Sequence, residues 1–290
     1  MKIGWIGTGV MGLSMADHLQ NGGHDLHIYN RTRSKAEQLL DRGGVWHDSP
    51  ASVAANSEIL FTMVGFPSDV EEIYFGEMGI LSSEKWPRIL VDMTTSKPSL
   101  AKRIAEVSSK SRIESLDAPV SGGDVGARDA VLAIMVGGQK KTFDEVLPLF
   151  HLMGKTISFM GEAGAGQHTK MCNQILVAGT MLGVCESLLY ASRLGIAEEA
   201  IIDVIGKGAA QSWAINNLGP RIAKGDYDPG FIVEHFIKDM GIALDEAASS
   251  GFSLPGLALV RQLYIALKAQ GHGRSGTQAL ILALKKLNGE

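Results

Sequence analysis

The sequence predicts an α/β fold with a doubly wound, mostly parallel sheet, followed by an all-α domain joined to it through a long helix. Three observations lead to this prediction. Short β-rich runs alternate with helical patterns through the first half, as in a parallel sheet with crossover helices. Strand patterns nearly vanish after Gly195, and one long helical pattern lies between the two halves. The expected division is a sheet domain over residues 1–162, an interdomain helix over 163–194 and a helical domain over 195–290.

In the first half, the strands are short, apolar and rich in β-branched residues, and they are bounded by turn residues. The expected strands are 2–7, 26–30, 59–64, 89–93, 115–119, 132–137 and 156–160. The expected helices between them include 11–22, 35–41 and 142–153. The order of these elements indicates a sheet whose strands are buried on both faces.

The long helix follows glycines at Gly161, Gly164 and Gly166 and continues to about Arg193. Residues 175–184 are apolar on every side, which predicts a buried helix that joins the two domains. The helices expected after it are 197–206, 212–223, 235–249 and 255–270. Glycine- and proline-rich breakers separate these helices.

Composition narrows the class of protein. The chain has 290 residues, 45% hydrophobic and 20% charged, with a net charge of −4, which describes an ordinary soluble protein and argues against a nucleic-acid-binding surface. Cys172 and Cys185 lie roughly 20 Å apart along one helix, so they cannot bridge, and both are expected to be reduced and buried. Residues 1–7 are already strand-like, so no signal peptide is expected. The apolar run that ends at Glu186 is expected to be too short to span a membrane. We expect a cytoplasmic protein.

A glycine-rich motif occupies the first strand–helix junction. The sequence Gly7-Thr8-Gly9-Val10-Met11-Gly12 is a G-x-G-x-x-G after a strand and before a helix, the context that confirms this pattern. The first two glycines allow a tight turn close to a pyrophosphate, and the third lets helix and strand pack. A plain strand–turn–helix is the alternative. The motif predicts a Rossmann-type dinucleotide site.

The end of the second strand indicates which dinucleotide binds. A site for the ribose 2′-hydroxyl of NAD carries an acidic residue there, whereas this chain has Asn30-Arg31-Thr32-Arg33. Two guanidinium groups suit the 2′-phosphate of NADP, which arginine can hold through two hydrogen bonds. We therefore expect NADP, with NAD possible. The alternative is a solvated basic turn.

Two further polar turns follow strands at the edge of the sheet where ligands bind. Thr94, Thr95 and Ser96 are placed to contact the nicotinamide or its ribose, although Ser96 could simply cap the next helix. Ser121-Gly122-Gly123 offers successive N–H groups and a hydroxyl, which suit a carboxylate, although an ordinary turn is equally compatible.

Lys170, Asn173 and Gln174 lie on one face of the long helix, at i, i+3 and i+4. Lys170 is about one turn from the positive end of the helix dipole, and apolar surroundings would lower its pKa towards a value useful for proton transfer. A solvated surface lysine is the alternative. Lys238 could reach a cofactor, but its spacing favours a surface ion pair. His168 and His235 lack partners at metal-ligand spacing, so no metal is expected.

Taken together, these motifs resemble the β-hydroxyacid dehydrogenase family over essentially the whole chain. The family includes 3-hydroxyisobutyrate dehydrogenase, tartronate semialdehyde reductase and glyoxylate/succinic semialdehyde reductases. The matching motifs are the glycine-rich loop, Asn30-Arg31-Thr32, residues 117–123, residues 161–170 and Lys238-Asp239. The chain departs from the family at Gln174, where asparagine is common, and at Thr8 and His18.

The resemblance implies an enzyme that interconverts a short 3-hydroxy acid and its semialdehyde. It implies that Lys170 is catalytic and that the substrate contacts Ser121, Gly122, Gly123, Asn173 and Gln174. The expected cofactor contacts are Gly7, Thr8, Gly9, Val10, Met11, Gly12, Asn30, Arg31, Thr32, Met63, Val64, Thr95, Phe231 and Lys238. A homodimer or homotetramer with subunit contacts through the helical domain is also implied.

Three alternatives stay open. A glyoxylate or succinic semialdehyde reductase of the same family would use the same residues on a different acid. An imine reductase on a similar scaffold is disfavoured by Lys170, which such enzymes usually lack. A non-catalytic dinucleotide-binding module is disfavoured because the chain keeps both Lys170 and the Ser-Gly-Gly turn.

Overall fold

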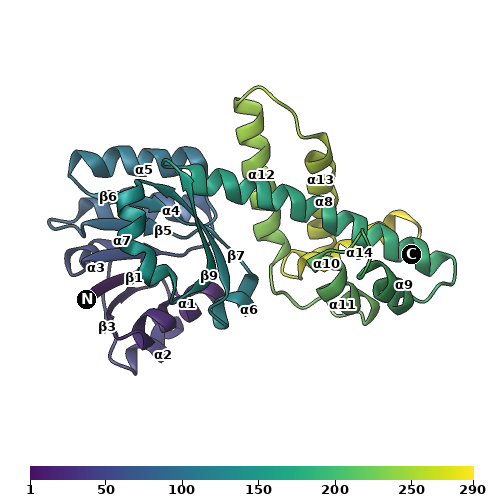
Figure 1. Cartoon of the computed structure of the whole chain (residues 1–290), viewed down its shortest axis with the longest axis horizontal. Coiled ribbons are helices and arrows are strands. Elements are labelled where there is room, and N and C mark those ends of the chain that lie inside the picture. Colours follow the sequence, from purple (N-terminus) through teal and green to yellow (C-terminus); the bar gives the residue numbers. More distant parts are fainter. The chain divides into compact units, whose positions relative to one another are not determined.

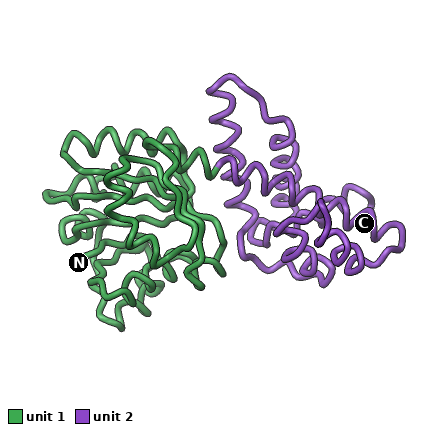
Figure 2. Tube along the Cα trace, viewed as in Figure 1, with its two compact units in different colours: residues 1–170 green, residues 171–290 purple.

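The computed structural model describes all 290 residues and divides into two compact units. The first unit comprises Met1–Lys170 and the second Met171–Glu290 (Figure 2). The boundary falls inside one continuous helix, α8 (Ala165–Arg193), and not at a loop on either side of it. The greater part of the long helix therefore belongs to the second unit.

The first unit alternates strands with helices (Figure 1). Its strands are β1 (Lys2–Ile6), β2 (Asp25–Tyr29), β3 (Val45–Trp46), β4 (Ile59–Thr62), β5 (Ile89–Asp92), β6 (Glu114–Asp117), β7 (Val120–Ser121), β8 (Leu132–Gly138) and β9 (Gly154–Gly161). Its α-helices are α1 (Val10–Asn21), α2 (Glu37–Leu40), α3 (Pro50–Ala55), α4 (Pro67–Phe75), α5 (Pro98–Lys110), α6 (Gly123–Arg128) and α7 (Lys140–Phe150), followed by the first turns of α8.

These strands form one sheet in the order β3-β2-β1-β4-β5-β6-β8-β7, with β9 paired to β8. Strands β1 to β6 pair in parallel, whereas β8 runs antiparallel to β6 and β7. The mostly parallel sheet predicted from the sequence is confirmed. The order reverses direction at β1, the kind of crevice at which sheets of this class bind ligands.

The core of the first unit lies on both faces of this sheet. One face packs Trp5, Phe61 and Phe150, and the other packs Leu60 and Tyr74, all fully buried. Neighbouring strand residues thus alternate between two apolar layers, which explains why the strands read as continuous apolar runs.

The second unit is entirely helical. After α8 come α9 (Glu198–Ile205), α10 (Trp213–Asn217), α11 (Gly219–Ala223), α12 (Val233–Ser249), α13 (Pro255–Leu267) and α14 (Leu280–Leu287). The single helix predicted over 212–223 is wrong: it is two short helices, because Pro220 cannot donate the hydrogen bond that would continue α10. The core gathers Met181, Cys185 and Leu188 of α8 with Phe236 and Tyr264.

Helix α8 is less buried than its sequence suggests. Met181, Cys185 and Leu188 face the core of the second unit, but Leu176 and Tyr190 are 72% and 69% exposed. Cys172 is also exposed, so the prediction of two buried thiols is wrong for that residue. Helix α8 is long and apolar enough to cross a membrane, so the expectation that this apolar run is too short to do so is wrong. Core helices of soluble proteins can have the same length and composition.

Candidate active site

The glycine-rich loop has the geometry of a dinucleotide site. Gly7 has φ +101, and a Cβ there would lie 2.1 Å from the carbonyl oxygen of Met63. A Cβ on Gly12 would lie 2.1 Å from the Gly7 carbonyl oxygen, so Gly12 allows α1 to pack against β1. A Cβ on Gly9 would meet nothing within 4 Å, which leaves the N-terminus of α1 open to a ligand.

The hydroxyl of Thr8 supports the same interpretation. Thr8 is 2% exposed, and its Oγ1 has no hydrogen-bond partner in the protein. Buried polar atoms are nearly always paired, so an unpaired hydroxyl beside an open helix N-terminus suits a bound polar group. The residues present therefore fit a dinucleotide, which the glycine-rich loop and the start of α1 would hold.

The segment after β2 presents two arginines. Asn30 is fixed by the Thr8 N–H, which donates to its Oδ1 at 3.1 Å, and by its own Nδ2, which donates to the Thr32 carbonyl. Arg31 is 80% exposed and lies 3.1 Å from the Asp69 carboxylate, while the guanidinium of Arg33 lies over the ring of Trp46. A 2′-phosphate approaching Arg31 would compete with Asp69.

Hydrogen bonds join the ends of β4 and β5. The Asp92 carboxylate accepts from the Thr62 hydroxyl at 2.8 Å and from the Thr94 N–H at 3.1 Å. The Thr94 hydroxyl in turn accepts from the Val64 N–H at 3.0 Å. Burial raises the pKa of Asp92 to about 6, although these hydrogen bonds act in the opposite direction. Val64 and the turn that contains Thr95 thus belong to one connected framework.

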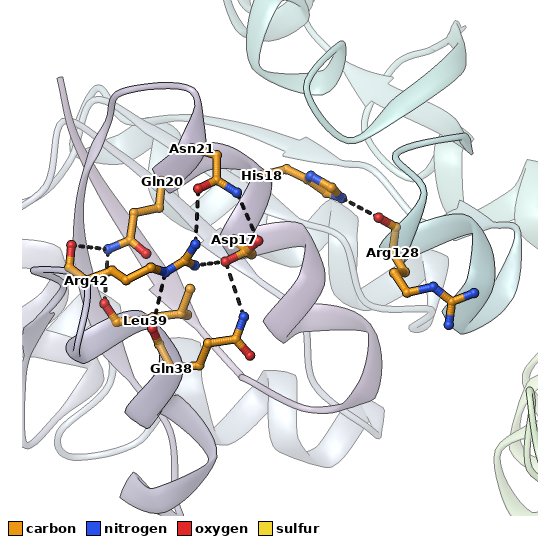
Figure 3. A network of polar contacts seen from close by, with 8 residues as sticks. All are labelled: Asp17, His18, Gln20, Asn21, Gln38, Leu39, Arg42 and Arg128. Carbon is orange, nitrogen blue, oxygen red and sulfur yellow. Dashed lines mark hydrogen bonds and ion pairs between the residues drawn. The ribbon is translucent and has the colours of Figure 1, made fainter.

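The Ser121-Gly122-Gly123 turn ends β7 and begins α6. Gly122 and Gly123 have φ +139 and +65, values that side chains other than glycine rarely adopt. The far end of α6 is fixed by His18 of α1, whose Nε2 donates to the carbonyl of Ala127 at 2.9 Å. It also donates to the carbonyl of Arg128 at 3.0 Å (Figure 3). His18 therefore ties the glycine-loop helix to the helix after this turn.

A buried carboxylate anchors the start of α8. Asp117, at the end of β6, accepts from the Gly164 N–H at 2.7 Å and the Gln167 N–H at 2.8 Å. Burial raises the pKa of Asp117 to about 6, against the effect of these N–H groups. A Cβ on Gly166 would lie 2.5 Å from the Asp117 carbonyl oxygen, so the helix packs directly on the strand backbone. Asp117, Gly164 and Gly166 therefore fix the start of α8, and with it the position of Lys170 along the helix.

Lys170 is 7% exposed, so the alternative of a solvated surface lysine is wrong. It is the last residue of the first unit, one turn beyond the anchored start of α8. A lysine buried this far is unusual unless its ammonium has partners or a function.

The other polar residues of this helix face belong to the second unit. The Nδ2 of Asn173 donates to the Oε1 of Gln174 at 2.8 Å, and the Nε2 of Gln174 donates to the Asp239 carboxylate at 2.5 Å. The Nζ of Lys238 lies 3.0 Å from the same carboxylate, with the side chain only 12% exposed. The expected ion pair of Lys238 is therefore present but buried, and the longer side chain of Gln174 reaches Asp239.

Within the first unit, the contacts above connect Gly7, Thr8, Asn30, Met63, Val64 and Thr94, which lie at the ends of β1, β2, β4 and β5. Phe231 and Lys238 belong to the second unit, and their contact with a cofactor stays a prediction. The sequence analysis assigned no role to three residues of this framework: Asp92, Asp117 and Gln167. Asp92 and Asp117 had a signal, because each ends a strand as a buried acid, whereas Gln167 had none.

The comparisons with known proteins agree with this geometry. Residues 2–161 match the family described as the NAD binding domain of 6-phosphogluconate dehydrogenase, and residues 164–284 match that of NADP-dependent 3-hydroxyisobutyrate dehydrogenase. A probable mitochondrial 3-hydroxyisobutyrate dehydrogenase-like protein of Arabidopsis thaliana is 52% identical over 99% of this chain and 86% of its own.

Two further relatives have more specific names. The 2-hydroxy-3-oxopropionate reductase of Escherichia coli is 38% identical over 98% of this chain and 97% of its own. The solved structure of Mycobacterium tuberculosis 3-hydroxyisobutyrate dehydrogenase with L-serine is 28% identical, covers 98% of each chain and superposes with a TM-score of 0.88.

The fold and the glycine-rich site define a Rossmann-type NAD(P)-dependent oxidoreductase. More specifically, the chain belongs to the 3-hydroxyisobutyrate dehydrogenase, or β-hydroxyacid dehydrogenase, family. The resemblance drawn from the sequence motifs is thereby confirmed.

Proposed function

We propose that this protein is an NADP-preferring enzyme that interconverts a short 3-hydroxy acid, similar to 3-hydroxyisobutyrate, and its semialdehyde. The observation that carries the proposal is the burial of Lys170 one turn into a helix whose start is anchored at the ligand-binding edge of the sheet. The relatives named for 3-hydroxyisobutyrate support the choice of acid.

In this proposal each group of residues has one role. The bound nicotinamide supplies or accepts the hydride. The glycine-rich loop holds the pyrophosphate, and Arg31 contacts the 2′-phosphate. The Ser121 hydroxyl and the N–H groups of Gly122 and Gly123 hold the substrate carboxylate. Lys170 gives a proton to the oxygen of the aldehyde during reduction and removes it from the alcohol during oxidation.

Asn173 and Gln174 are assigned to the substrate as well, on the face of α8 that carries Lys170. Gln174 is 3% exposed and already bonds Asp239 and Asn173. Its role is therefore to hold Asn173 in one orientation, and Asn173 is the more direct contact of the two.

One other substrate has specific support. The E. coli relative is a 2-hydroxy-3-oxopropionate reductase, which suggests an acid that carries a hydroxyl beside the aldehyde. Glyoxylate and succinic semialdehyde are further alternatives within the family. All of these acids carry a carboxylate and an aldehyde, so the proposed roles of Ser121 and Lys170 hold for each.

A panel of small aldehyde acids and 3-hydroxy acids, scored by nicotinamide absorbance with NADP(H) and NAD(H), tests the proposed reaction. The 3-hydroxyisobutyrate pair with NADP(H) is expected to give the highest kcat/KM. If the protein binds the dinucleotide but turns over no acid on the panel, the proposed reaction is wrong and the alternative of a non-catalytic dinucleotide-binding module is favoured.

Substitution of Lys170 tests the proposed proton transfer. Lys170→Ala is expected to lower kcat by on the order of 10²–10⁴, as for a lost general acid–base, with the affinity for NADP little changed. Lys170→Arg is expected to fail nearly as badly, because guanidinium stays protonated and cannot cycle. Lys207→Ala is the matched control, since Lys207 is an exposed lysine of the second unit. Near-normal kcat in folded Lys170→Ala would refute the assignment.

We also propose that the protein is a cytoplasmic homodimer or homotetramer. The exposed apolar side chains on α8 support self-association of the helical unit.

A further inference from the structure

Gln167 is the most completely buried polar side chain at the start of α8. It is 0% exposed, and both ends of its amide are bonded to the turn after β5. Its Oε1 accepts from the Ser96 N–H at 2.9 Å, and its Nε2 donates to the Thr94 carbonyl at 2.7 Å. The two bonds lie on either side of Thr95, so one side chain holds both ends of a three-residue turn.

The backbone of Gln167 is held equally firmly. Its N–H donates to Asp117 at 2.8 Å, and the preceding Gly166 packs so closely that a Cβ would lie 2.4 Å from the Met135 carbonyl oxygen. The first turn of α8 therefore cannot shift relative to β6 and β8. Lys170 follows three residues later, on the next turn of the same rigid helix.

The turn after β5, to which the Gln167 side chain is bonded, is also held rigidly by the sheet. The Thr94 N–H donates to the buried Asp92, and the Thr94 hydroxyl accepts from Val64 at the end of β4. A change in Gln167 would thus release the turn at Thr95 from α8 while the turn stays bonded to the sheet.

We propose that Gln167 is a positioning residue that sets the place of Lys170 relative to the turn at Thr95. This inference rests on the proposed function, in which Lys170 moves the proton, and on the expectation from the sequence that Thr95 contacts the nicotinamide or its ribose. Proton and hydride transfer must reach the same carbonyl group, so their sources need a fixed separation, and a misplacement of about 1 Å can cost 10²-fold in rate.

Gln167→Met tests this role, because methionine keeps the buried volume and removes both hydrogen bonds. We expect kcat to fall by on the order of 10–100-fold. The KM of the substrate and the Kd of NADPH should stay within a factor of about 3, since Gln167 is not proposed to touch either ligand. The primary isotope effect with C4-deuterated cofactor should increase, because hydride transfer becomes more nearly rate-limiting.

Gln20→Met is the matched control. The side-chain amide of Gln20 also bonds the backbone of another segment, because its Nε2 donates to the carbonyls of Leu39 and Arg42, far from Lys170 in the sequence (Figure 3). Its substitution should leave kcat and the isotope effect unchanged. A simple loss of stability would affect both variants, whereas a positioning role predicts a kinetic effect only at Gln167.

The Gln167→Glu variant provides a second, independent test of the proposal. It can be used if the methionine variant does not fold. Glutamate can accept from the Ser96 N–H, but its ionised form cannot donate to the Thr94 carbonyl. Its kcat should therefore approach the wild-type value at low pH and fall as the new carboxyl ionises. A pH profile identical to that of the wild type would overturn the proposal.

The outcomes separate the two proposals. Wild-type kcat and isotope effect in folded Gln167→Met, together with an inactive Lys170→Ala, would overturn the positioning role and leave the proposed function intact. An active Lys170→Ala would overturn the proposed function itself.

Discussion

At the scale of single residues, Arg31 is proposed to set the cofactor preference. It belongs to the segment after β2, where a site for the ribose of NAD carries an acidic residue, and its side chain is 80% exposed. Arg31→Ala is expected to weaken NADP binding by on the order of 10–100-fold, the value of a lost charge-assisted contact, and to change NAD binding little. Titration of the wild-type protein and of Arg31→Ala with NADP and with NAD measures these affinities. Equal loss for NADP and NAD would show that Arg31 does not read the 2′-phosphate.

The ion pair of Arg31 with Asp69 provides an opposite variant. Asp69→Asn removes the carboxylate that lies 3.1 Å from the guanidinium, so NADP should bind more tightly while NAD is unchanged. The side chain of Asp69 also accepts from the Phe66 N–H at the start of α4, and asparagine can keep that bond. Asn in place of Asp therefore tests the charge without removing the cap.

Single residues also show where sequence reasoning ends. The conformation of the glycine-rich motif and the helical position of Lys170 were predictable, because backbone conformation and helical spacing follow from local sequence. The contacts of Gln167 and Gln174 were not, because their partners Thr94 and Asp239 lie 73 and 65 residues away in the chain. The sequence around a helical glutamine does not indicate which distant loop its side chain will bond.

At the scale of elements, the turn between β7 and α6 is the most sensitive part of the proposed substrate site. Gly122→Val is expected to raise KM for the acid strongly, because φ is +139 and the new side chain would press on Leu132. The affinity for NADP should stay near the wild-type value. Steady-state kinetics and cofactor titration measure the two effects.

The control for this turn is Gly256→Ala, at a position with negative φ where a Cβ meets nothing within 4 Å. Thermal unfolding of Gly122→Val and of the milder Gly122→Ala would separate loss of the site from loss of the fold. If NADP binding is lost and KM is kept, the turn belongs to the cofactor site.

The elements missed by the sequence are short or lack periodicity. Strands β3 and β7 have two residues each, too few to show an alternating pattern, and β7 is recognisable only from its pairing with β8. Helices α3 and α4 were not among the expected helices, although they begin with Pro50 and Pro67, and proline is favoured at the first position of a helix.

At the scale of the whole molecule, the exposed face of α8 is expected to hold subunits together. Tyr190→Glu should shift the protein from a dimer or tetramer towards the 30.9 kDa monomer, because a charge would be buried in an apolar contact. Light scattering after gel filtration measures the mass. Val204→Glu is the matched control, since Val204 is 72% exposed on α9. A wild-type protein that is already monomeric would contradict the expectation.

The two-unit division has a consequence for how such a protein can change. Most domain boundaries lie in loops, where genes can be cut and recombined without harm to either part. Here the boundary separates Lys170 from Met171 within an unbroken helix. A gene fusion made at that point would have to preserve the helical phase of α8 as well as the reading frame. One inserted residue would turn Asn173 and Gln174 by about 100° around the helix axis relative to Lys170. Chimaeras of this fold should therefore tolerate exchanged sequence at the junction but not a changed length.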